Sequence, residues 1–241
     1  MNSDLLPFNY QFRRSSRASK TRIIVKPGQV EIVAPHHISD FRLQQFIHAQ
    51  KQWILDSLAK LEKKTSPHAK LTPDLYLHGA NIPFLGSTYP LAIQSTPLKR
   101  VKVEFLDNFI AHVPESLPPL AHNEAIKQAM IAWMKKQLLL HVESLIQQHG
   151  ACHQLFPRSV IIKTQKSRWG SCGIHNDISI NLMLILAPLK VIEYVVVHEL
   201  CHIKIKNHSP HFWALVAQHL PDYPVQIRWL KFHGPSLMSG F

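Results

Sequence analysis

Two histidines and a glutamate within one apolar stretch of the chain have the types and spacing needed for metal-assisted hydrolysis. His198, Glu199 and His202 form the pattern His-Glu-x-x-His. Because residues four apart project from the same face of a helix, the two imidazoles can occupy neighbouring positions on one metal ion. Glu199 would lie beside that ion, where its carboxylate can accept a proton from a metal-bound water. The pattern therefore predicts a hydrolytic metal site.

A third imidazole, that of His208, follows shortly after this motif. Asn207 is a residue type at which helices often end, so the chain can turn back there and bring His208 to the same ion. Three histidines leave the fourth zinc position open for water, which is typical of catalytic sites. In a chain with 17 histidines, about 0.04 chance matches to the motif are expected, so helix placement and His208 must support it. We expect Zn²⁺, held by His198, His202 and His208, as the cofactor.

Beyond these residues the sequence leaves alternatives open for the group that stabilises an oxyanion. The candidates lie before and after the motif: Arg168, Tyr194, His211 and Tyr223. Arg168, the candidate for a substrate or transition-state contact, could equally pair with an acid and fix its own loop. His211 is more typical of a solvated helix residue.

Aromatic and cysteine residues around the motif are expected to serve packing rather than chemistry. Trp169, Phe212 and Trp213 are interpreted as core residues. Cys172 lies in a Gly-Ser-Cys-Gly sequence, which predicts a small buried residue in a tight turn, with a thiol close to the metal as the alternative. Cys201, between the two histidines of the motif, is expected to pack.

The elements that must position the site are read from periodicity and from helix-capping signals. Pro188 would open a helix over 189–204, and Ser209-Pro210 would open another over 210–220. Strands are predicted at 160–165 and 178–184, with 170–177 joining them as a hairpin. Further helices are predicted at about 122–148 and 226–232.

The N-terminal part reads as strands followed by a helix. Strands at 21–25 and 29–34 flank a turn at 26–28, a helix runs from about residue 40 to 61, and several short strands follow within 75–115, separated by Gly79, Gly86, Pro90 and Pro97. The proline-rich stretch 114–119 reads as a linker. We therefore expect an α+β protein with two regions: a β-rich N-terminal region with one helix over 1–118, and a catalytic domain over 119–241.

The motifs together resemble a known family. His198-Glu-Leu-Cys-His202 with Asn207-His208-Ser209 and Phe212-Trp213, preceded by Arg168-Trp-Gly-Ser-Cys172, Ile180-Asn-Leu and Ala187-Pro188, is similar to the YgjP-like zinc metallopeptidase domain, which is related to the SprT and WLM peptidases. The resemblance covers residues 125–235 closely and the N-terminal part loosely. It implies a zincin-like catalytic half, with an active-site helix beside strands, zinc on the three histidines and Glu199 as the base. An edge strand, 178–184 or 160–165, would pair with an extended peptide.

The leading function is therefore a zinc-dependent metallopeptidase acting on a peptide or protein substrate. Two alternatives stay open. A metal-dependent nucleoside triphosphate pyrophosphohydrolase would use Lys and Arg for phosphate contacts, although no Gly-rich phosphate loop is present. A DNA-associated binding or protease module would use the net charge of +12. The basic surface could bind nucleic acid or nucleotides weakly, or serve only solubility.

Cysteine usage and hydropathy indicate the compartment. Cys152, Cys172 and Cys201 are an odd, widely spaced set without a Cys-x-x-Cys pair, which favours a reducing environment. The first twenty residues lack the apolar core of a secretory signal, and the most apolar window, 178–189, is interrupted by Asn181 and Pro188. The sequence thus predicts a cytoplasmic protein with no membrane segment.

Overall fold

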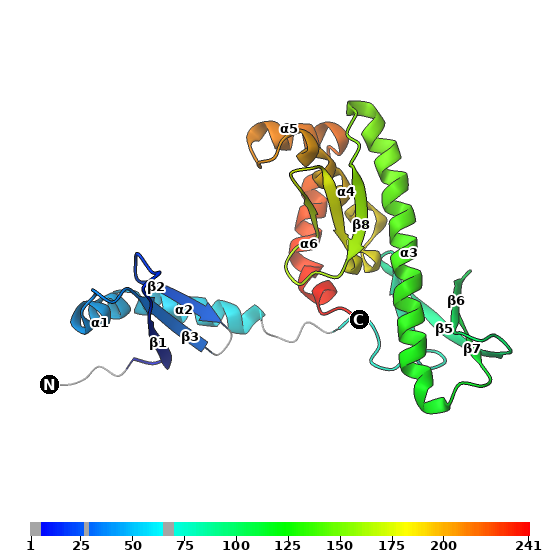
Figure 1. Cartoon of the computed structure of the whole chain (residues 1–241), viewed down its shortest axis with the longest axis horizontal. Helices are drawn as coiled ribbons and strands as arrows, with labels where there is room; N and C mark the ends of the chain where they lie inside the picture. Colours follow the sequence, from blue (N-terminus) through cyan, green and yellow to red (C-terminus); the bar gives the residue numbers. More distant parts are fainter. Residues whose placement is uncertain (1–5, 27–28, 65–69) are drawn as a thin grey trace. The chain divides into compact units, whose positions relative to one another are not determined.

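The chain divides into two compact units, Met1–His68 and Ala69–Phe241. A computed structural model describes residues 6–26, 29–64 and 70–241 (Figure 1). The boundary between the units lies well before the one expected at 118/119. The reason is that the buried faces of the strands within 81–114 belong to the same hydrophobic core as the long helix that follows them. The stretch 114–119 is thus a short connection within one unit.

The N-terminal unit is a three-stranded sheet with two helices. Its elements are β1 (Tyr10–Arg14), β2 (Arg22–Lys26), β3 (Gln29–Ala34), α1 (Asp40–Ala49) and α2 (Lys51–Lys64). The central strand β3 pairs with β1 in parallel and with β2 antiparallel. Alternate residues of β3, Val30 and Ile32 among them, pack on Ile47 of α1 and Ile54 of α2.

Three sequence expectations for this unit are refined by the structure. The expected hairpin is present as the antiparallel pair β2–β3, and Pro27 and Gly28 of its turn lie outside the described residues. The single helix expected from residue 40 is two helices, with the break at Gln50. Strand β1 is an additional strand outside the expected hairpin, in which Tyr10 and Phe12 alternate with polar residues but are themselves exposed.

The second unit contains two further sheets and the remaining helices. Its elements are β4 (Asn81–Phe84), β5 (Ser87–Thr96), β6 (Lys102–Phe105), β7 (Phe109–Pro114), α3 (Pro119–His153), β8 (Ser159–Lys163), β9 (Gly170–Cys172), β10 (Asp177–Asn181), the 3-10 helix η1 (Leu182–Leu186), α4 (Leu189–Lys204), α5 (Pro210–His219) and α6 (Tyr223–Met238). The expected α+β class is confirmed. None of the helices among the described residues is long and apolar enough to cross a membrane.

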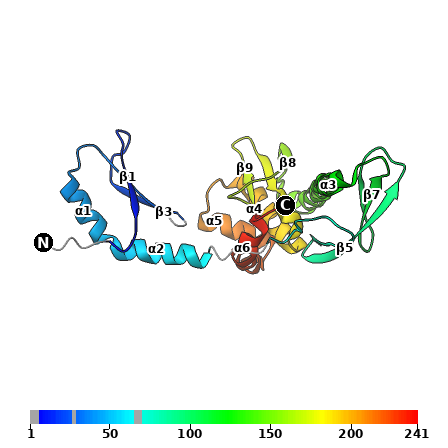
Figure 2. The same ribbon diagram turned by 90° about the horizontal axis from the view of Figure 1, so that it is seen from below.

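Helix α3 joins the two sheets of this unit. It contacts β6 and β7 of one sheet and β8 of the other, as well as α4, and Figures 1 and 2 show it running past both sheets. A stripe of fully buried residues with helical spacing, which includes Met130, Met134 and Leu138, forms its core face. The helix therefore connects the β8–β10 sheet and the β4–β7 sheet on one element.

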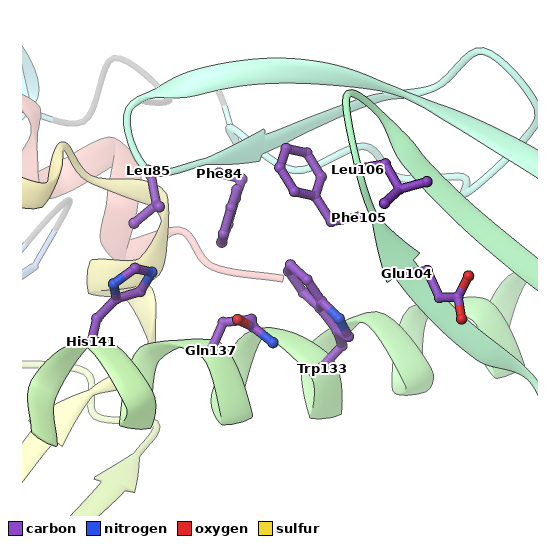
Figure 3. A pocket seen from close by; sticks show the side chains of 8 residues that line it. All are labelled: Phe84, Leu85, Glu104, Phe105, Leu106, Trp133, Gln137 and His141. Carbon is purple, nitrogen blue, oxygen red and sulfur yellow. The ribbon is translucent and has the colours of Figure 1, made fainter. Parts of the chain in front are cut away.

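The sheet next to the first half of α3 has the order β4-β5-β7-β6. Pro90, expected to separate strands, lies inside β5, at the point where β5 stops pairing with β4 and starts pairing with β7. A proline is tolerated there because one side of the strand is still a free edge. Phe84 and Phe105 face Trp133 of α3 across a cleft (Figure 3), so rings attach this sheet to the helix.

The sheet next to the second half of α3 has the order β8-β10-β9. Strand β10 pairs in parallel with β8 and antiparallel with β9. The two expected strands are present, but the expected hairpin between them is wrong, because β8 and β10 pair in parallel and residues 170–172 of the expected connection form β9, which pairs antiparallel with β10. The predicted strand 178–184 ends at Asn181 and continues as η1. Because β10 is central, both of its edges are occupied, and it cannot serve as the edge strand that the sequence allowed it to be.

Candidate metal centre

Helix α4 holds the His-Glu-x-x-His motif in a largely buried position. Pro188 precedes its first turn, as expected. Val196, Val197 and Cys201 are fully buried, so the helix is packed on its core side along the length of the motif. Cys201 packs as predicted. A helix fixed in this way holds the side chains of His198 and Glu199 with little freedom.

The three histidines of the predicted site converge. His198 Nε2 lies 3.2 Å from His202 Nε2 and 3.1 Å from His208 Nε2, and the latter two atoms are 3.2 Å apart. His208 reaches this position from the short connection between α4 and α5. Among the residues that the structure describes, these three form the one group of histidine, cysteine or acidic side chains arranged to hold a metal ion.

The donor atoms fit a tetrahedral metal ion such as zinc. Two nitrogens bound to zinc at 2.0–2.1 Å with a tetrahedral angle lie about 3.3–3.4 Å apart, close to the observed separations. His202 Nδ1 lies 2.9 Å from the Ile205 carbonyl oxygen, to which it can only donate, so its Nε2 carries a lone pair. Burial, with the charges of His202 and His208, lowers the pKa of His198 to about 3. His198 is therefore neutral at pH 7, as a metal ligand must be.

Aromatic side chains from α5 hold the imidazole rings. Phe212, which is fully buried, stacks on the His202 ring with centroids 4.4 Å apart and meets the rings of His198 and His208 edge-on. Trp213 lies 5.8 Å from the rings of both His198 and His208. The predicted packing role of Phe212 is confirmed. This side chain belongs to the hydrophobic core and also contacts the three imidazole rings.

Glu199 is buried beside the three imidazoles. Burial raises the pKa of its carboxyl to about 7, against the lowering effects of the Arg168 charge and of a hydrogen bond from the Cys172 backbone N–H. The side chain lies against strand β9, with its carboxylate next to Gly170. A carboxyl group with this pKa can both accept and release a proton near neutral pH.

Of the four oxyanion candidates, Arg168 and Tyr194 lie at the site. Arg168 is exposed, and its charge acts on Glu199. The Tyr194 hydroxyl lies 3.5 Å from His198 Nδ1, and burial and the Glu199 charge raise its pKa to about 12. The ring of Tyr223 stacks between those of Tyr194 and Trp213, so it packs against two of the aromatic residues around the three histidines.

The fourth candidate, His211, lies apart from the three histidines, and Trp169 and Cys172 have surroundings that differ from the expected ones. His211 is exposed, and no contact of its side chain with the three histidines occurs among the described residues. Trp169 is half-buried and contacts Gly234 of α6. Cys172 lies half-buried in strand β9, not in a tight turn, because residues 170–172 pair with β10.

A small cavity opens directly at Glu199. It has a volume of about 250 Å³ and is lined by Trp169, Gly170, Tyr194, Val195, His198 and Glu199. Strand β9, the edge of its sheet, forms one wall through Gly170, and α4 forms another. Sequence reasoning missed Gly170 and β9 as parts of the site. The signal that could have found them is the Trp-Gly-Ser-Cys motif itself, whose glycine had been interpreted as a turn residue.

The comparison with protein families agrees with this site. Residues 19–233 match the family model described as YgjP-like, metallopeptidase domain. A search of curated proteins found no match. The family description indicates a hydrolase with a metal cofactor, and the three-histidine group is where the described residues can hold one. The match covers most of the chain, and the protein therefore belongs to the YgjP-like metallopeptidase family.

Proposed function

We propose that this protein is a zinc-dependent metallopeptidase with a zincin-like catalytic half. The observation that carries the proposal is the convergence of three imidazole nitrogens beside the buried carboxyl group of Glu199. His198, His202 and His208 would hold Zn²⁺ through their Nε2 atoms. Bound zinc supplies Lewis acidity, which lowers the pKa of water and polarises a carbonyl group.

Glu199 acts as the general base and then as the general acid. Its carboxylate takes a proton from the attacking water and returns it to the nitrogen of the leaving amine as the peptide bond breaks. The pKa of about 7 suits both transfers, because the proton is held neither too weakly nor too strongly at neutral pH. The surrounding valine and tyrosine side chains keep bulk water from the carboxyl group.

Arg168 and Tyr194 are the groups available to stabilise negative charge on the carbonyl oxygen. Both act electrostatically on Glu199, which means that both lie near the reacting centre. Tyr194 is buried and held by stacking on Tyr223, so its hydroxyl is the more ordered donor. Arg168 is exposed and has the reach to contact a bound substrate.

The edge of strand β9 is the surface on which an extended peptide can lie. Gly173 N–H donates to the Asp177 carbonyl, and the Trp169 carbonyl accepts from Asn181 N–H. In an antiparallel pair such contacts alternate, so the backbone groups of Gly170 and Cys172 point away from β10, toward the free edge. Of these groups the Cys172 N–H already donates to Glu199, which leaves the Cys172 C=O and the N–H and C=O of Gly170 for a peptide. A peptide strand added there would pass beside Glu199.

The nucleotide alternative has less support at this site. Besides His198 and Glu199, the lining of the cavity consists of aromatic, apolar and small residues, and the cations whose charges act on the site are Arg168 and Lys206, on separate elements. A triphosphate is usually bound by several cations or by a row of backbone N–H groups. Measuring pyrophosphate release and peptide cleavage with one zinc-loaded preparation distinguishes the two reactions.

The test of the proposal is the variant Glu199→Gln. It keeps the size of the side chain but cannot take a proton, so we expect peptide cleavage to fall about 10²–10⁴-fold. Zinc content, measured by elemental analysis, should stay at the wild-type level. The probe is a library of proteome-derived peptides, with cleavage read by mass spectrometry. Wild-type activity in a zinc-loaded Glu199→Gln protein would contradict the proposal.

A further inference from the structure

Gly170 stands where any side chain would collide with Glu199. A Cβ atom built there would lie 2.6 Å from Glu199 Oε1, 2.7 Å from Cγ and 2.9 Å from Cδ. Real Cβ contacts are almost never this short. The backbone does not explain the glycine, because the glycines with positive φ among the described residues are Gly79, Gly86 and Gly240. Gly170 is thus required because the absence of a side chain leaves room for the carboxyl group of Glu199.

The backbone of the same strand also contacts the carboxylate. The Cys172 N–H, on the side of β9 that faces away from β10, donates a hydrogen bond to Glu199. Gly170 and Cys172 are two residues apart, so both lie along one edge of the strand. Together they form a shallow backbone surface on which the carboxylate rests.

Strand β9 is held in place by contacts around it. The Asn181 side-chain amide donates to the Arg168 carbonyl at 2.9 Å. After the strand, Lys206 Nζ, just beyond the end of α4, donates to the Gly173 carbonyl at 3.0 Å and to Asn176 Oδ1 at 2.7 Å. These bonds connect the β9–β10 hairpin to the end of the helix that carries Glu199, and so fix the separation of strand and helix.

We propose that the Arg168–Cys172 segment is the seat of the general base, with Gly170 and the Cys172 backbone as positioning groups for Glu199. The catalytic meaning of this seat rests on the proposed function, whereas the packing itself does not. A base must lie within hydrogen-bond reach of the proton that it takes, and a misplacement of about 1 Å costs about 100-fold in rate. Without the glycine, Glu199 cannot keep its position.

The first experiment compares Gly170→Ala with Gly173→Ala, the matched glycine of the same hairpin. A Cβ at Gly173 would meet the Asp177 carbonyl oxygen at 3.6 Å, an ordinary contact. On the best-cleaved peptide of the library, Gly170→Ala should lower kcat about 100-fold and leave KM and zinc content within about twofold. Gly173→Ala should behave as the wild type. Unchanged kcat in a zinc-loaded Gly170→Ala protein would overturn the positioning role.

The second experiment measures packing without activity. Melting temperatures of the zinc-loaded wild type, Gly170→Ala, Glu199→Ala and the double variant form a mutant cycle. Gly170→Ala should lower the melting temperature of the wild type by about 5 °C, because the methyl group overpacks the site. In the Glu199→Ala background it should cost almost nothing, since the colliding atoms are gone.

The cycle separates the failure of this inference from the failure of the proposed function. If Gly170→Ala destabilised the protein equally in both backgrounds, the proposed packing of Glu199 on the Arg168–Cys172 segment would be wrong, whatever the activity. A strong coupling in the cycle, together with no cleavage of any library peptide by the wild type, would support the seat and contradict the peptidase.

Discussion

Two ring clusters in the Ala69–Phe241 unit are built alike but serve different ends. The imidazole cluster comprises His198, His202, His208, Phe212 and Trp213. The aromatic cluster, at the junction of the β4–β7 sheet and α3, comprises Phe84, Tyr89, Phe105, Phe109 and Trp133. In both, rings from separate elements meet mostly edge-to-face or tilted, at centroid separations of 4.4–6.4 Å.

The difference lies in what converges at the centre. In the aromatic cluster the neighbouring edges are C–H groups, so every contact adds burial and dispersion. In the imidazole cluster three nitrogens approach within 3.1–3.2 Å, and no arrangement of protons gives all of them a good hydrogen bond. The comparison teaches that the aromatic cluster stabilises the fold by its packing alone, whereas the close nitrogens of the imidazole cluster are an arrangement that the proposed cation would stabilise.

The largest effect is expected at the imidazole cluster itself. His208→Ala leaves two ligands, so zinc content should fall from about one ion per chain to near zero, and peptide cleavage should be lost. The matched control is His211→Ala, whose exposed side chain lies nearby in sequence. Elemental analysis after dialysis provides the measurement. Full zinc retention by His208→Ala would contradict the assignment of His208 as a zinc ligand.

In the aromatic cluster, Phe109→Ala should reduce the free energy of unfolding by about 3–5 kcal/mol, because Phe109 is fully buried and leaves a cavity. Leu106→Ala, at a side chain that is 71% exposed, should change it by less than about 0.5 kcal/mol. Urea unfolding measures both. Zinc affinity of folded Phe109→Ala should equal that of the wild type, and a large loss of affinity would show that the clusters are coupled.

Metal removal sharpens the same comparison. Zinc at 100 times its dissociation constant should stabilise the folded protein by about 2.7 kcal/mol, so chelation should lower the melting temperature of the wild type. Leu106→Ala should show the same shift. His208→Ala should show none, because it has no complete site to empty. A chelator effect of equal size in His208→Ala would place the stabilising metal elsewhere.

The smallest effect concerns a buried pair away from both clusters. Glu193 accepts from His149 at 3.0 Å and from Lys190 at 2.8 Å. Burial raises the pKa of Glu193, but these two hydrogen bonds outweigh it, and the pKa is lowered overall. The stabilisation is therefore complete above the unfolded pKa of about 4.3, and is lost as pH falls through the lower folded value.

Glu193→Gln should thus cost about 1–2 kcal/mol at neutral pH and flatten the loss of stability on acidification below about pH 4.5. Denaturant unfolding at a series of pH values measures this. A variant with the same acid dependence as the wild type would assign that dependence to other carboxyl groups. Zinc content is the control, since Glu193 lies on α4 but contacts none of the three histidines among the described bonds.

Much of the site could be predicted from the sequence because it depends on local periodicity. The spacing of His198 and His202 places them on one face of any helix. The expectation that the helix ends at Asn207 is wrong by a short distance, because α4 ends at Lys204 and Ile205 is its C-cap. The prediction of zinc rests on the same spacing. The expectation that the basic surface binds nucleic acid or nucleotides stays a prediction, since charge alone does not identify a partner.

Other features depend on which elements pair, and no local pattern encodes this. The division of the chain at residue 68 follows from the β4–β7 sheet sharing a core with α3, although a proline-rich stretch separates them in sequence. Strand β1 is short and its apolar residues, Tyr10 and Phe12, are exposed, so its place depends on its parallel pairing with β3. The sequence allows either β8 or β10 to be an edge strand, and only the strand order β8-β10-β9 shows that β10 is the central one.

The sequence by itself determined which groups make up the proposed site: three imidazoles and one carboxyl group with the spacing that predicts a hydrolytic metal site. Tertiary structure alone decided how the carboxyl group is held, since Gly170 and Glu199 meet only when β9 packs on α4. The physical reason is one of range. Helical periodicity determines which residues are neighbours within one or two turns of a helix. The space beside Gly170 of β9, in contrast, is occupied by a side chain of α4, which is distant in sequence and reaches it only in the folded protein.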